Sequence, residues 1–511
     1  MSAVVDEPIA ATLVGDVLRE AAARYPDRDA YVHREKRSTY AWLDRAADGF
    51  AATLLERGVR KGDVVCLLLQ SSTKFAACYA GMLRVGAIAS AINPRLGVAE
   101  RTSIFARTTP ALTVLGDGLA VPEAADAGAV LPVSELKEAF AADPPARFPR
   151  LDPSDPTCIV WTSGTSGAPK GAVYDHAAQQ AIARNIVGLA AMGDRRLWVT
   201  PMPHVGYMTR FYHEIAHAST LVLVLEPWSP EEALEAIERE RVTVATGVPT
   251  QWSLLVQHPK TRTTDMSSLR LVSMGGGPVP PDLVRRVRDL FGCGVMNRYT
   301  STEAGLTTAT VPGDPDEVVA LTVGRPGPDV EVRTVDPASG APVAAGAVGE
   351  VVCRSACRMR EYWRDPELTA RVIDADGWLH TGDLGTFGDD GNVRLVGRLK
   401  EMYIRGGYNV YPSEVEDALT DHPAIARAAV VGIPDPTFGE IGVAYVVPAT
   451  ASDALLTADD VRAWCRARLA DYKAPDRVIV VEEFPLTSML KVDKRALVER
   501  AIEERTSEAS R

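Results

Sequence analysis

A run of small and hydroxyl-bearing residues that includes a lysine is the part of this sequence best suited to chemistry. It is Thr162-Ser163-Gly164-Thr165-Ser166-Gly167-Ala168-Pro169-Lys170-Gly171, directly after an apolar run at 158–161 that is typical of a buried strand. Glycines let the backbone approach an anion, hydroxyls and amides donate hydrogen bonds, and the lysine adds a mobile positive charge. The run predicts a phosphate-binding loop, although its composition also fits a mobile surface loop. Its glycine and lysine spacing is not that of P-loop ATPases.

Further polar and glycine-rich motifs follow along the chain, each too short to indicate a function alone. They are Pro201-Met202-Pro203-His204, Gly275-Gly276-Gly277-Pro278, Tyr299-Thr300-Ser301-Thr302-Glu303, Gly349-Glu350, and the segments 376–383, 397–402, 406–410, 412–416, 432–435, 472–475 and 485–491. In this order and at these spacings they resemble the motifs of the adenylate-forming superfamily, which includes acyl- and aryl-CoA synthetases, luciferases and nonribosomal adenylation domains. The resemblance covers almost the whole chain and points to a stand-alone acyl- or aryl-CoA synthetase.

The resemblance implies a two-step reaction on a carboxylic acid. A carboxylate repels nucleophiles and lacks a good leaving group, so it first attacks the α-phosphorus of ATP. This gives an acyl-adenylate (acyl-AMP) and pyrophosphate, and the thiol of coenzyme A (CoA) then displaces AMP. Both transition states concentrate charge near phosphate, so positioned cations and amide donors should dominate catalysis. The expected cofactors are ATP with its product AMP, Mg²⁺ and CoA.

The resemblance also assigns roles to residues by their position in the motifs. Nucleotide binding is expected at Thr162, Ser163, Gly164, Thr165, Ser166, Gly167, Lys170, Gly275, Gly276, Gly277, Asn297, Tyr299, Thr300, Ser301, Thr302, Asp383, Arg398 and Lys491. Within this set Thr302 would contact the α-phosphate, and Glu303 with Thr165 would ligate Mg²⁺, a hard cation that prefers oxygen. Lys491 would stabilise the charge that develops during adenylation. The expected catalytic residues are Lys491, His204, Thr302 and Glu303.

The acid and the thiol are expected to bind at other motifs. The resemblance places the acyl site at His204, Val205, Gly206, Tyr207, Met208, Gly276 and Thr302. Glycines and apolar residues in these segments favour a roomy apolar pocket, so the expected acid is bulky and hydrophobic, aromatic or polycyclic. Lys400 takes the family's hinge position, where a few torsions let a small domain swing. The swing would withdraw Lys491 and bring Gly406 and Gly407 to the pantetheine of CoA.

Four positions depart from the family's motifs, since Leu490, Thr300, Ser355 and Glu361 stand where glycine is usual. Leu490 directly precedes Lys491, and an error of about an ångström in placing a catalytic group can cost about a hundredfold in rate. One alternative is therefore a ligase that accepts a preformed acyl-adenylate because its adenylation is impaired. Two others are acyl transfer to a carrier-protein thiol and a non-catalytic scaffold that binds acyl-adenylate.

The elements that position these motifs follow from the hydrophobic pattern. Runs such as 64–69, 221–225 and 242–245 are apolar on both faces, which is typical of parallel strands covered by helices. Amphipathic stretches lie between such runs, among them one with Leu283, Val284, Val287, Leu290 and Phe291 on one face. After residue 400 the elements shorten, and Ser413-Glu414-Val415-Glu416 predicts a helix opened by a capping box.

This alternation predicts an α/β fold. We expect a large N-terminal domain over 1–397 with buried sheets and helices, which binds adenylate and acid. A hinge at 398–402 would lead to a small, mobile α+β C-terminal domain over 403–511.

Composition limits the class of protein. With 55 Lys and Arg against 67 Asp and Glu, the net charge is −12 over 511 residues, which disfavours a general nucleic-acid or anionic-membrane surface. No segment approaches the roughly 18 apolar residues of a membrane span, the start lacks a signal peptide, and seven scattered cysteines suit a reducing compartment. We expect a cytoplasmic monomer or homodimer whose partners are a carboxylic acid, acyl-AMP and CoA, with no nucleic acid and no membrane.

Overall fold

The computed structural model describes residues 7–162, 169–225, 228–277, 279–449, 457–487 and 491–509, without the side chains of 506–509. By its contacts the chain divides into two compact units. The first unit is Met1–Val332 with Cys353–Leu379, and the second unit is Arg333–Val352 with His380–Arg511. The expected domain boundaries, with a hinge at 398–402 between residues 397 and 403, stay a prediction.

The first unit contains a sheet of nine strands within the described residues. In spatial order they are β15 (Arg325–Pro326), β14 (Gly305–Ala309), β13 (Gly294–Ser301), β12 (Leu271–Gly275), β11 (Val244–Gly247), β9 (Arg195–Trp198), β10 (Thr220–Leu223), β1 (Asp29–His33) and β2 (Lys36–Thr39). The run from β13 to β1 is parallel, and the strands at both edges are antiparallel. The expected strands at 221–225 and 242–245 are therefore found, as β10 and β11, in the buried parallel part.

A second sheet of the first unit has seven strands among the described residues. They are β18 (Glu361–Tyr362), β8 (Lys170–Asp175), β7 (Pro156–Thr162), β4 (Ile88–Ala91), β3 (Val64–Leu68), β5 (Leu112–Leu115) and β6 (Ala129–Pro132). β8 pairs antiparallel with both β7 and β18, while β7, β4, β3, β5 and β6 run parallel. Every residue of β3 is buried, as its doubly apolar run predicts.

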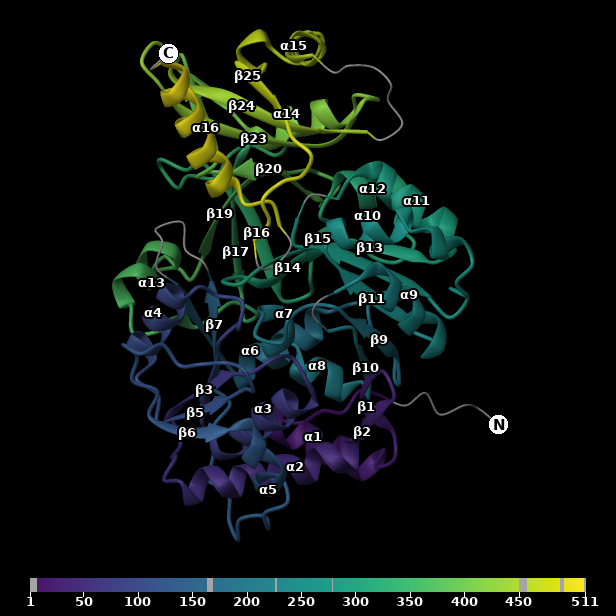
Figure 1. Ribbon diagram of the computed structural model, residues 1–511, viewed down its shortest axis with the longest axis vertical. Coiled ribbons are helices and arrows are strands. Elements are labelled where there is room, and N and C mark those ends of the chain that lie inside the picture. The colour runs from purple at the N-terminus through teal and green to yellow at the C-terminus, as the bar shows by residue number, and fades with distance from the viewer. Residues whose placement is uncertain are drawn as a thin grey trace. The chain divides into compact units, whose positions relative to one another are not determined.

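Helices cover these sheets (Figure 1). In the first unit they are α1 (Val14–Arg24), α2 (Tyr40–Glu56), α3 (Thr73–Val85), α4 (Val98–Thr108), α5 (Leu136–Ala139), α6 (His176–Asn185), α7 (Val205–Met208), α8 (Phe211–Ala216), α9 (Pro230–Arg239), α10 (Pro249–Gln257), α11 (Pro281–Phe291), α12 (Asp316–Leu321) and α13 (Pro366–Val372), with 3₁₀ turns at Val133–Glu135 and Pro259–Arg262. α9, α10 and α11 share one apolar core with β11, β12 and β13. The expected apolar face of α11 is confirmed except at Leu290, which is exposed. None of the described helices is both long enough and apolar enough to cross a lipid bilayer.

The second unit is built around a sheet with five strands in its described residues. Its strands are β22 (Tyr408–Val410), β21 (Tyr403–Arg405), β24 (Gly439–Pro448) and β23 (Ile425–Asp435), with β25 (Arg477–Val480) parallel to β24. α14 (Pro412–Thr420), α15 (Ala458–Arg466) and α16 (Lys494–Ala509) accompany it, with a 3₁₀ turn at Asp471–Lys473 (Figure 1). Two apolar cores, one on each face, stabilise the sheet. Most of a further sheet, β16 (Val330–Val335), β17 (Gly349–Ser355), β19 (Leu379–Phe387) and β20 (Val393–Arg398), also lies in this unit.

The start of α14 corrects one expectation. The helix forms where it was expected, but its N-cap is Tyr411 and no side chain caps it. Ser413 lies inside the helix, and its hydroxyl donates to the carbonyl of Val396. Glu416 accepts a hydrogen bond from the amide of Val430 at 2.7 Å. Both capping-box side chains are therefore used in contacts with strands. The predicted α/β fold, with a large first part and a small α+β C-terminal part, is confirmed.

All seven cysteines are free and buried. Burial raises the pKa of every one of these thiols, for example that of Cys66 to about 11 and that of Cys158 to about 12. Since the thiolate is the reactive form, these thiols have low reactivity at neutral pH.

Candidate active site

The predicted phosphate loop joins two neighbouring antiparallel strands. Thr162 ends β7 and pairs with Lys170 at the start of β8, so the hairpin closes the loop at its base. Five expected nucleotide-binding residues lie outside the described part of the chain, and their roles stay predictions: Ser163, Gly164, Thr165, Ser166 and Gly167. Lys170 itself is partly buried at the mouth of this loop.

Lys170 and Glu303, which are 133 positions apart in the sequence, meet at the side chain of Tyr362. The Lys170 ammonium lies 5.7 Å from the centre of the Tyr362 ring, within the range of a cation–π contact. The Tyr362 hydroxyl donates to Oε1 of Glu303 at 2.8 Å. Burial, and then the charge of Glu303, raise the pKa of Tyr362, so the phenol stays protonated and keeps donating. The phosphate-loop lysine and the expected metal ligand thus contact the same tyrosine side chain, one at its ring and the other at its hydroxyl.

Tyr362 was not among the residues singled out in the sequence. It belongs to the two-residue strand β18, which pairs with β8 so that Tyr362 lies opposite Ala172. The only signal was its place beside Glu361, one of the four departures from the family's motifs. Its contact with Glu303 spans 59 positions and depends on the sheet, which local patterns do not reveal.

The backbone of the 299–303 motif is fixed by hydrogen bonds from the neighbouring sheet. Tyr174, on β8, donates its hydroxyl to the carbonyl of Thr302 at 2.8 Å. The amide of Met359 donates to the carbonyl of Glu303, also at 2.8 Å. One strand, β8, therefore carries Lys170 and helps to position Thr302. Tyr174 is a second positioning residue that the sequence did not indicate.

The glycine motif after β12 is shaped by close backbone approach. A Cβ atom on Gly275 would lie 2.6 Å from the carbonyl oxygen of Arg298 on β13, and Gly276 has a φ of +79°. A side chain at either position would clash or strain the backbone. Gly277 has more room, since its nearest neighbour would be Pro249 at 3.8 Å. The flat strip of backbone expected beside the adenine is consistent with this geometry, and the nucleotide contact stays a prediction.

Four further expected nucleotide contacts on β13 differ in their surroundings. Asn297 is buried, and its amide donates to the carbonyl of Thr322 at 2.9 Å. Tyr299 is buried, while Thr300 is exposed where the β13–β14 register shifts. Ser301 accepts a hydrogen bond from the amide of Ala304 at 2.9 Å. Asn297 and Ser301 thus have partners within the protein, and Thr300 is the exposed residue of the four. The nucleotide contacts of all four stay predictions.

The expected acyl segment forms the short helix α7. His204 is its N-cap, and Nδ1 accepts a hydrogen bond from the amide of Gly206 at 3.1 Å. Val205, Tyr207 and Met208 are buried. The Tyr207 hydroxyl lies 2.8 Å from that of Tyr31, and its ring meets Trp198 edge to face. α7 is therefore fixed by its core-facing side, and the contact of its residues with an acid stays a prediction.

The second unit gathers three of the expected nucleotide contacts. Asp383 on β19 pairs in register with Arg398 on β20, and Arg398 Nε lies 3.1 Å from the carboxylate of Asp383. Lys491 is exposed as a residue, but protein around its ammonium desolvates it. This desolvation, together with the charge of Arg398, lowers the pKa of Lys491, and Asp383 opposes the shift. The carbonyl of Lys491 accepts from the amide of Thr487 at 2.7 Å.

The expected hinge and CoA residues lie in two turns of the second unit. Lys400 is exposed in the turn after β20, where the amides of Glu401 and Met402 donate to the carbonyl of Arg398. Gly406 and Gly407 join β21 to β22 with φ of +57° and +87°. Two positive φ angles in a two-residue hairpin require glycine or asparagine. The turn alone explains both glycines, and their contact with CoA stays a prediction.

The structure accommodates three of the four departures from the family's motifs. Besides the exposed Thr300, Ser355 accepts a hydrogen bond from the amide of Cys357 at 2.9 Å. Glu361 lies opposite Val173 in the pairing of β18 with β8. Leu490 lies outside the described residues, so its effect on Lys491 stays a hypothesis.

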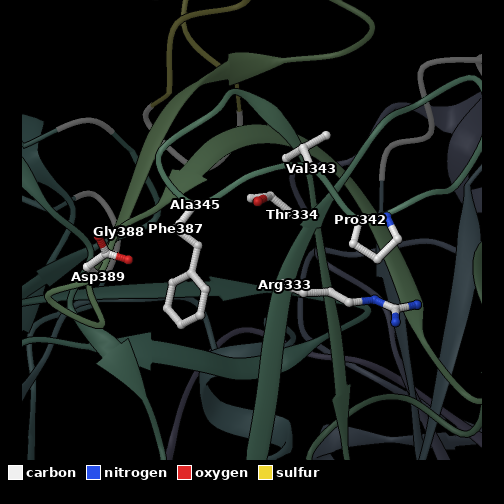
Figure 2. Close-up of a pocket in the computed structure, with 8 residues that line it drawn as sticks. All are labelled: Arg333, Thr334, Pro342, Val343, Ala345, Phe387, Gly388 and Asp389. Atoms are coloured by element: carbon white, nitrogen blue, oxygen red, sulfur yellow. The ribbon is translucent and has the colours of Figure 1, made fainter.

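A cavity of about 250 Å³ lies elsewhere in the second unit (Figure 2). Arg333, Thr334, Pro342, Val343, Ala345, Phe387, Gly388 and Asp389 line it. It is smaller than most ligand pockets, and none of its lining residues belongs to the motifs. We do not assign it to the active site.

Comparison with known proteins identifies the family. The AMP-binding enzyme family matches residues 18–363, and the AMP-binding enzyme C-terminal domain matches residues 414–491. The chain is 34% identical to 3-[(3aS,4S,7aS)-7a-methyl-1,5-dioxo-octahydro-1H-inden-4-yl]propanoyl:CoA ligase of Rhodococcus jostii (strain RHA1), over 96% of this chain and 98% of that one. It is 35% identical to feruloyl-CoA synthase of Amycolatopsis sp, over 92% and 95%.

A solved structure is similar over nearly the whole chain as well. Amide bond synthetase McbA from Marinactinospora thermotolerans matches with a TM-score of 0.86 and 33% identity, over 95% of this chain and 99% of that one. The family models, the relatives and the fold agree, and they confirm the resemblance found in the motifs. The chain belongs to the AMP-binding enzyme family, within the adenylate-forming superfamily, and is an AMP-forming acid–thiol ligase.

Proposed function

We propose that this ligase converts a bulky, largely apolar carboxylic acid, through its acyl-adenylate, to the thioester of CoA. The observation that carries the ATP-dependent step is the cluster of Lys170, Tyr362 and Glu303 at the base of the phosphate loop. It holds a cation and a carboxylate at fixed positions beside the segment expected to enclose the β- and γ-phosphates.

Mg²⁺ fits this cluster. Among the described residues, no group of three or more His, Cys, Asp or Glu side chains is arranged to hold a metal ion. A cation at Glu303 would therefore share its coordination sphere with phosphate oxygens, the usual mode of Mg²⁺, and with Thr165. When bound, Mg²⁺ offsets negative charge on the phosphates. Tyr362 keeps the Glu303 carboxylate oriented, and Lys170 is placed to neutralise a further phosphate oxygen.

In the second unit, Asp383 would accept hydrogen bonds from the ribose hydroxyls, with Arg398 beside it. Lys491 would supply the positive charge at the bridging oxygens while the carboxylate attacks phosphorus. Its lowered pKa reflects an ammonium that is already partly desolvated, so less water must leave when an anion arrives. Gly406 and Gly407 would contact pantetheine in the second half-reaction, after movement about Lys400.

The class of acid rests on the relatives and on the surroundings of α7. One relative is named for an acid with a bicyclic ring system and another for ferulic acid, which is aromatic. Val205, Tyr207 and Met208, in the expected acyl segment, are buried apolar or aromatic residues, which suits apolar surroundings for the acid. These observations support an aromatic or polycyclic acid.

A panel of aromatic and polycyclic acids, incubated with ATP, Mg²⁺ and CoA, tests the function. Mass spectrometry scores acyl-AMP and acyl-CoA separately. We expect both products from at least one acid. Lys491→Ala should lower acyl-AMP formation at least about a hundredfold, the size expected when one stabilising group is removed from a transition state. Lys260→Ala, which removes an exposed lysine paired with Glu231 and Glu235, should leave the rate unchanged.

Other outcomes correspond to the alternatives. Thioester from synthetic acyl-AMP and CoA, but none from acid and ATP, would identify a ligase with impaired adenylation, and Leu490→Gly should then restore the first step. If the acyl group is found only on the phosphopantetheine of a carrier protein and not on CoA, the carrier protein is the acceptor. No thioester from synthetic acyl-AMP with either acceptor would overturn the proposal in favour of a binding scaffold.

A further inference from the structure

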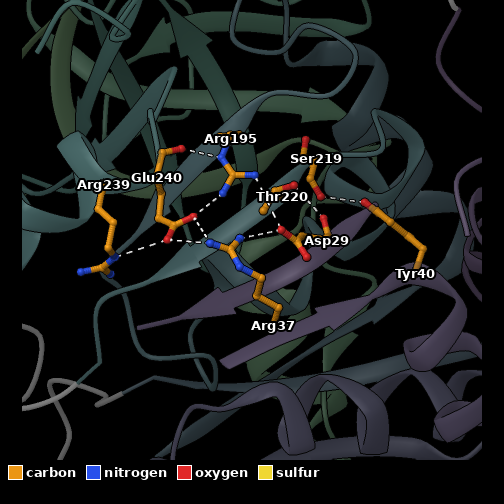
Figure 3. Close-up of polar contacts among 8 residues, drawn as sticks. All are labelled: Asp29, Arg37, Tyr40, Arg195, Ser219, Thr220, Arg239 and Glu240. Atoms are coloured by element: carbon orange, nitrogen blue, oxygen red, sulfur yellow. Dashed lines mark hydrogen bonds and ion pairs between the residues drawn. The ribbon is translucent and has the colours of Figure 1, made fainter. Parts of the chain in front are cut away.

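Two groups of arginines on and beside the nine-stranded sheet differ in their counter-charges. Near the surface, Arg37, Arg195 and Arg239 surround the carboxylate of Glu240, and Arg37 also contacts Asp29 (Figure 3). Arg37 lies 3.0 Å from Glu240 and 2.7 Å from Asp29. These guanidinium groups have carboxylate partners and remain in contact with solvent, so their charges are well compensated.

The second group is buried. We name it the arginine cluster, and it consists of Arg196 on β9, Arg210 at the start of α8, Arg298 on β13 and Glu214 on α8. Arg196 and Glu214 are each 2% exposed, Arg210 is 7% and Arg298 is 8% exposed. Arg196 Nε lies 3.0 Å from Glu214, and Arg210 donates to Glu214 at 2.9 Å. In the described part of the chain, Glu214 is the single carboxylate that pairs with Arg196 and Arg210.

Several donors of the arginine cluster have no hydrogen-bond partner among the described residues. They are both Nη atoms of Arg196, Nε of Arg210 and Nε of Arg298. The hydroxyl of Ser273 is also unpartnered, and Ser273 lies on the same face of β12 and β13 as Arg298. Glu214 Oε2, which lies 3.0 Å from Arg196 Nε, and both ring nitrogens of the adjacent His213 also have no hydrogen-bond partner among the described residues. Buried donors without acceptors each cost free energy, and the four unpartnered guanidinium nitrogens still outnumber the acceptors that these two side chains offer.

The arginine cluster also has more positive than negative charge, and neighbouring groups do not compensate the difference. Burial, followed by the charges of neighbouring His217, Arg210 and other arginines, lowers the pKa of His213 well below its ordinary value, so this histidine is neutral. Burial, with the charges of Arg210 and Arg196, also lowers the pKa of Arg298. Guanidinium groups nevertheless keep their proton in proteins. Three buried cations therefore share one buried carboxylate, an arrangement that is unfavourable until another acceptor arrives.

The position of the arginine cluster connects it with the expected acyl site. Arg210 follows α7, the helix of the expected acyl segment, by two residues. Arg298 directly precedes Tyr299 and lies opposite Gly275 in the pairing of β13 with β12. Arg298 thus shares β13 with expected nucleotide contacts, and Arg210 and Glu214 lie at the start of and within α8, which follows the expected acyl segment in the chain.

We propose that the arginine cluster binds an oxygen acceptor, a carboxylate or a ketone, at the end of the acid remote from the reacting carboxylate. The excess positive charge favours a carboxylate, while the unpartnered donors suit either group. This inference rests on the proposed function, because it assumes that an acid enters beside α7. It also modifies the expectation of a purely hydrophobic acid, since the pocket would be apolar along its walls and polar at its end.

Three probe acids with the same reacting arm test the inference: 3-phenylpropanoate, 3-(4-acetylphenyl)propanoate and 3-(4-carboxyphenyl)propanoate. Their kcat/KM values are measured on the full chain with ATP and CoA. We expect at least tenfold preference for one or both acceptor-bearing acids over 3-phenylpropanoate. Comparison of the ketone-bearing acid with the carboxylate-bearing acid shows which acceptor group the arginine cluster binds. Arg298→Met and Arg196→Met should bring this ratio close to one.

Arg195→Met is the matched control. Arg195 neighbours Arg196 on β9, points to the opposite face and contacts Glu240, so its removal should leave the ratio unchanged. A preference ratio near one in the wild-type enzyme, or a high ratio that survives both Arg298→Met and Arg196→Met, would overturn the inference. Water alone would then satisfy the arginine cluster.

Thermal unfolding gives a readout that does not need turnover. Without ligand, Arg298→Met should raise Tm, because it removes an uncompensated buried charge, whereas a merely structural arginine would lower Tm on removal. The acceptor-bearing acids should raise the Tm of the wild-type protein more than 3-phenylpropanoate does, and this difference should vanish in Arg298→Met. If no probe is turned over but these shifts occur, the acceptor site stands, and the proposed function is decided separately by the assays with synthetic acyl-AMP. Equal shifts from all three acids would overturn the site.

Discussion

Tyr362 contributes to the candidate site through two contacts, with its hydroxyl on Glu303 and its ring facing Lys170. Replacing it with phenylalanine keeps the ring and removes the hydroxyl. A hydrogen bond to a charged group contributes about 1.5–3 kcal/mol, so Tyr362→Phe should lower the adenylation rate about tenfold or more. It should also raise the Mg²⁺ concentration needed for half-maximal ATP–pyrophosphate exchange.

Tyr212→Phe is the matched control for this residue. It removes a hydroxyl that donates to the carbonyl of Ala11 at 2.9 Å, far from the phosphate loop in sequence. It should leave the Mg²⁺ dependence unchanged. An unaltered Mg²⁺ dependence in Tyr362→Phe would show that Tyr362 does not position Glu303 for catalysis.

Lys491 gives a prediction about pH. Desolvation and Arg398 lower its pKa from the ordinary value of 10.5, so its ammonium is lost at a lower pH than that of a free lysine. Adenylation should be intact below this lowered pKa and should fall as pH rises through it. ATP–pyrophosphate exchange measured from pH 7 to 10.5 should show this alkaline decline. Lys491→Arg should move the decline upward, at a lower overall rate, because a guanidinium keeps its proton but differs in shape. A wild-type rate that shows no decline up to pH 10.5 would contradict the assignment.

Among the elements, the β21–β22 hairpin separates two roles that glycine can have. Gly407 has a positive φ, and a Cβ atom there would meet nothing within 4 Å. Gly407→Ala should cost about 1–2 kcal/mol, while Gly407→Asn should keep the turn, since asparagine tolerates positive φ. If the glycine also lets pantetheine approach, Gly407→Asn should raise the KM for CoA at least tenfold with little change in Tm.

Gly340→Asn provides the comparison, because Gly340 has a φ of +70° and equally open surroundings in the same unit. It should change neither KM nor Tm appreciably. A wild-type KM for CoA in Gly407→Asn would mean that the glycine serves the turn alone.

The sequence predicted elements better than it predicted contacts. The buried strands and α11 follow from apolar periodicity, which is a local signal, while the roles that the motifs assign to Glu303, Lys170 and Lys491 stay predictions. The capping box at 413–416 was wrong because contacts with Val396 and Val430 recruit the polar side chains of Ser413 and Glu416. The Tyr362–Glu303 bond and the arginine cluster join strands that are distant in the chain. No local pattern reveals such a pairing, since it depends on sheet order.

On the scale of the whole molecule, each unit has its own apolar cores and its own ion pairs, and the pairs of Lys494 in the second unit are partly buried. Arg84 contacts Asp44 and Asp48 in the first unit, and Lys494 contacts Glu401 at 2.8 Å and Glu416 at 2.9 Å in the second. We expect calorimetry to resolve two unfolding transitions. Arg84→Gln and Lys494→Gln should each lower a different transition, by about 2–4 °C per kcal/mol lost. A single transition that both variants lower equally would contradict this.

The low reactivity of the native cysteines has a practical consequence. All seven native thiols are buried and have raised pKa values, so they should not react with a maleimide label at neutral pH. A cysteine introduced on the surface should react with it. One such site on each unit would give a doubly labelled enzyme without removing any native cysteine. Fluorescence energy transfer between the two dyes would then test for the predicted swing about Lys400 in real time, first with ATP and acid and then with CoA.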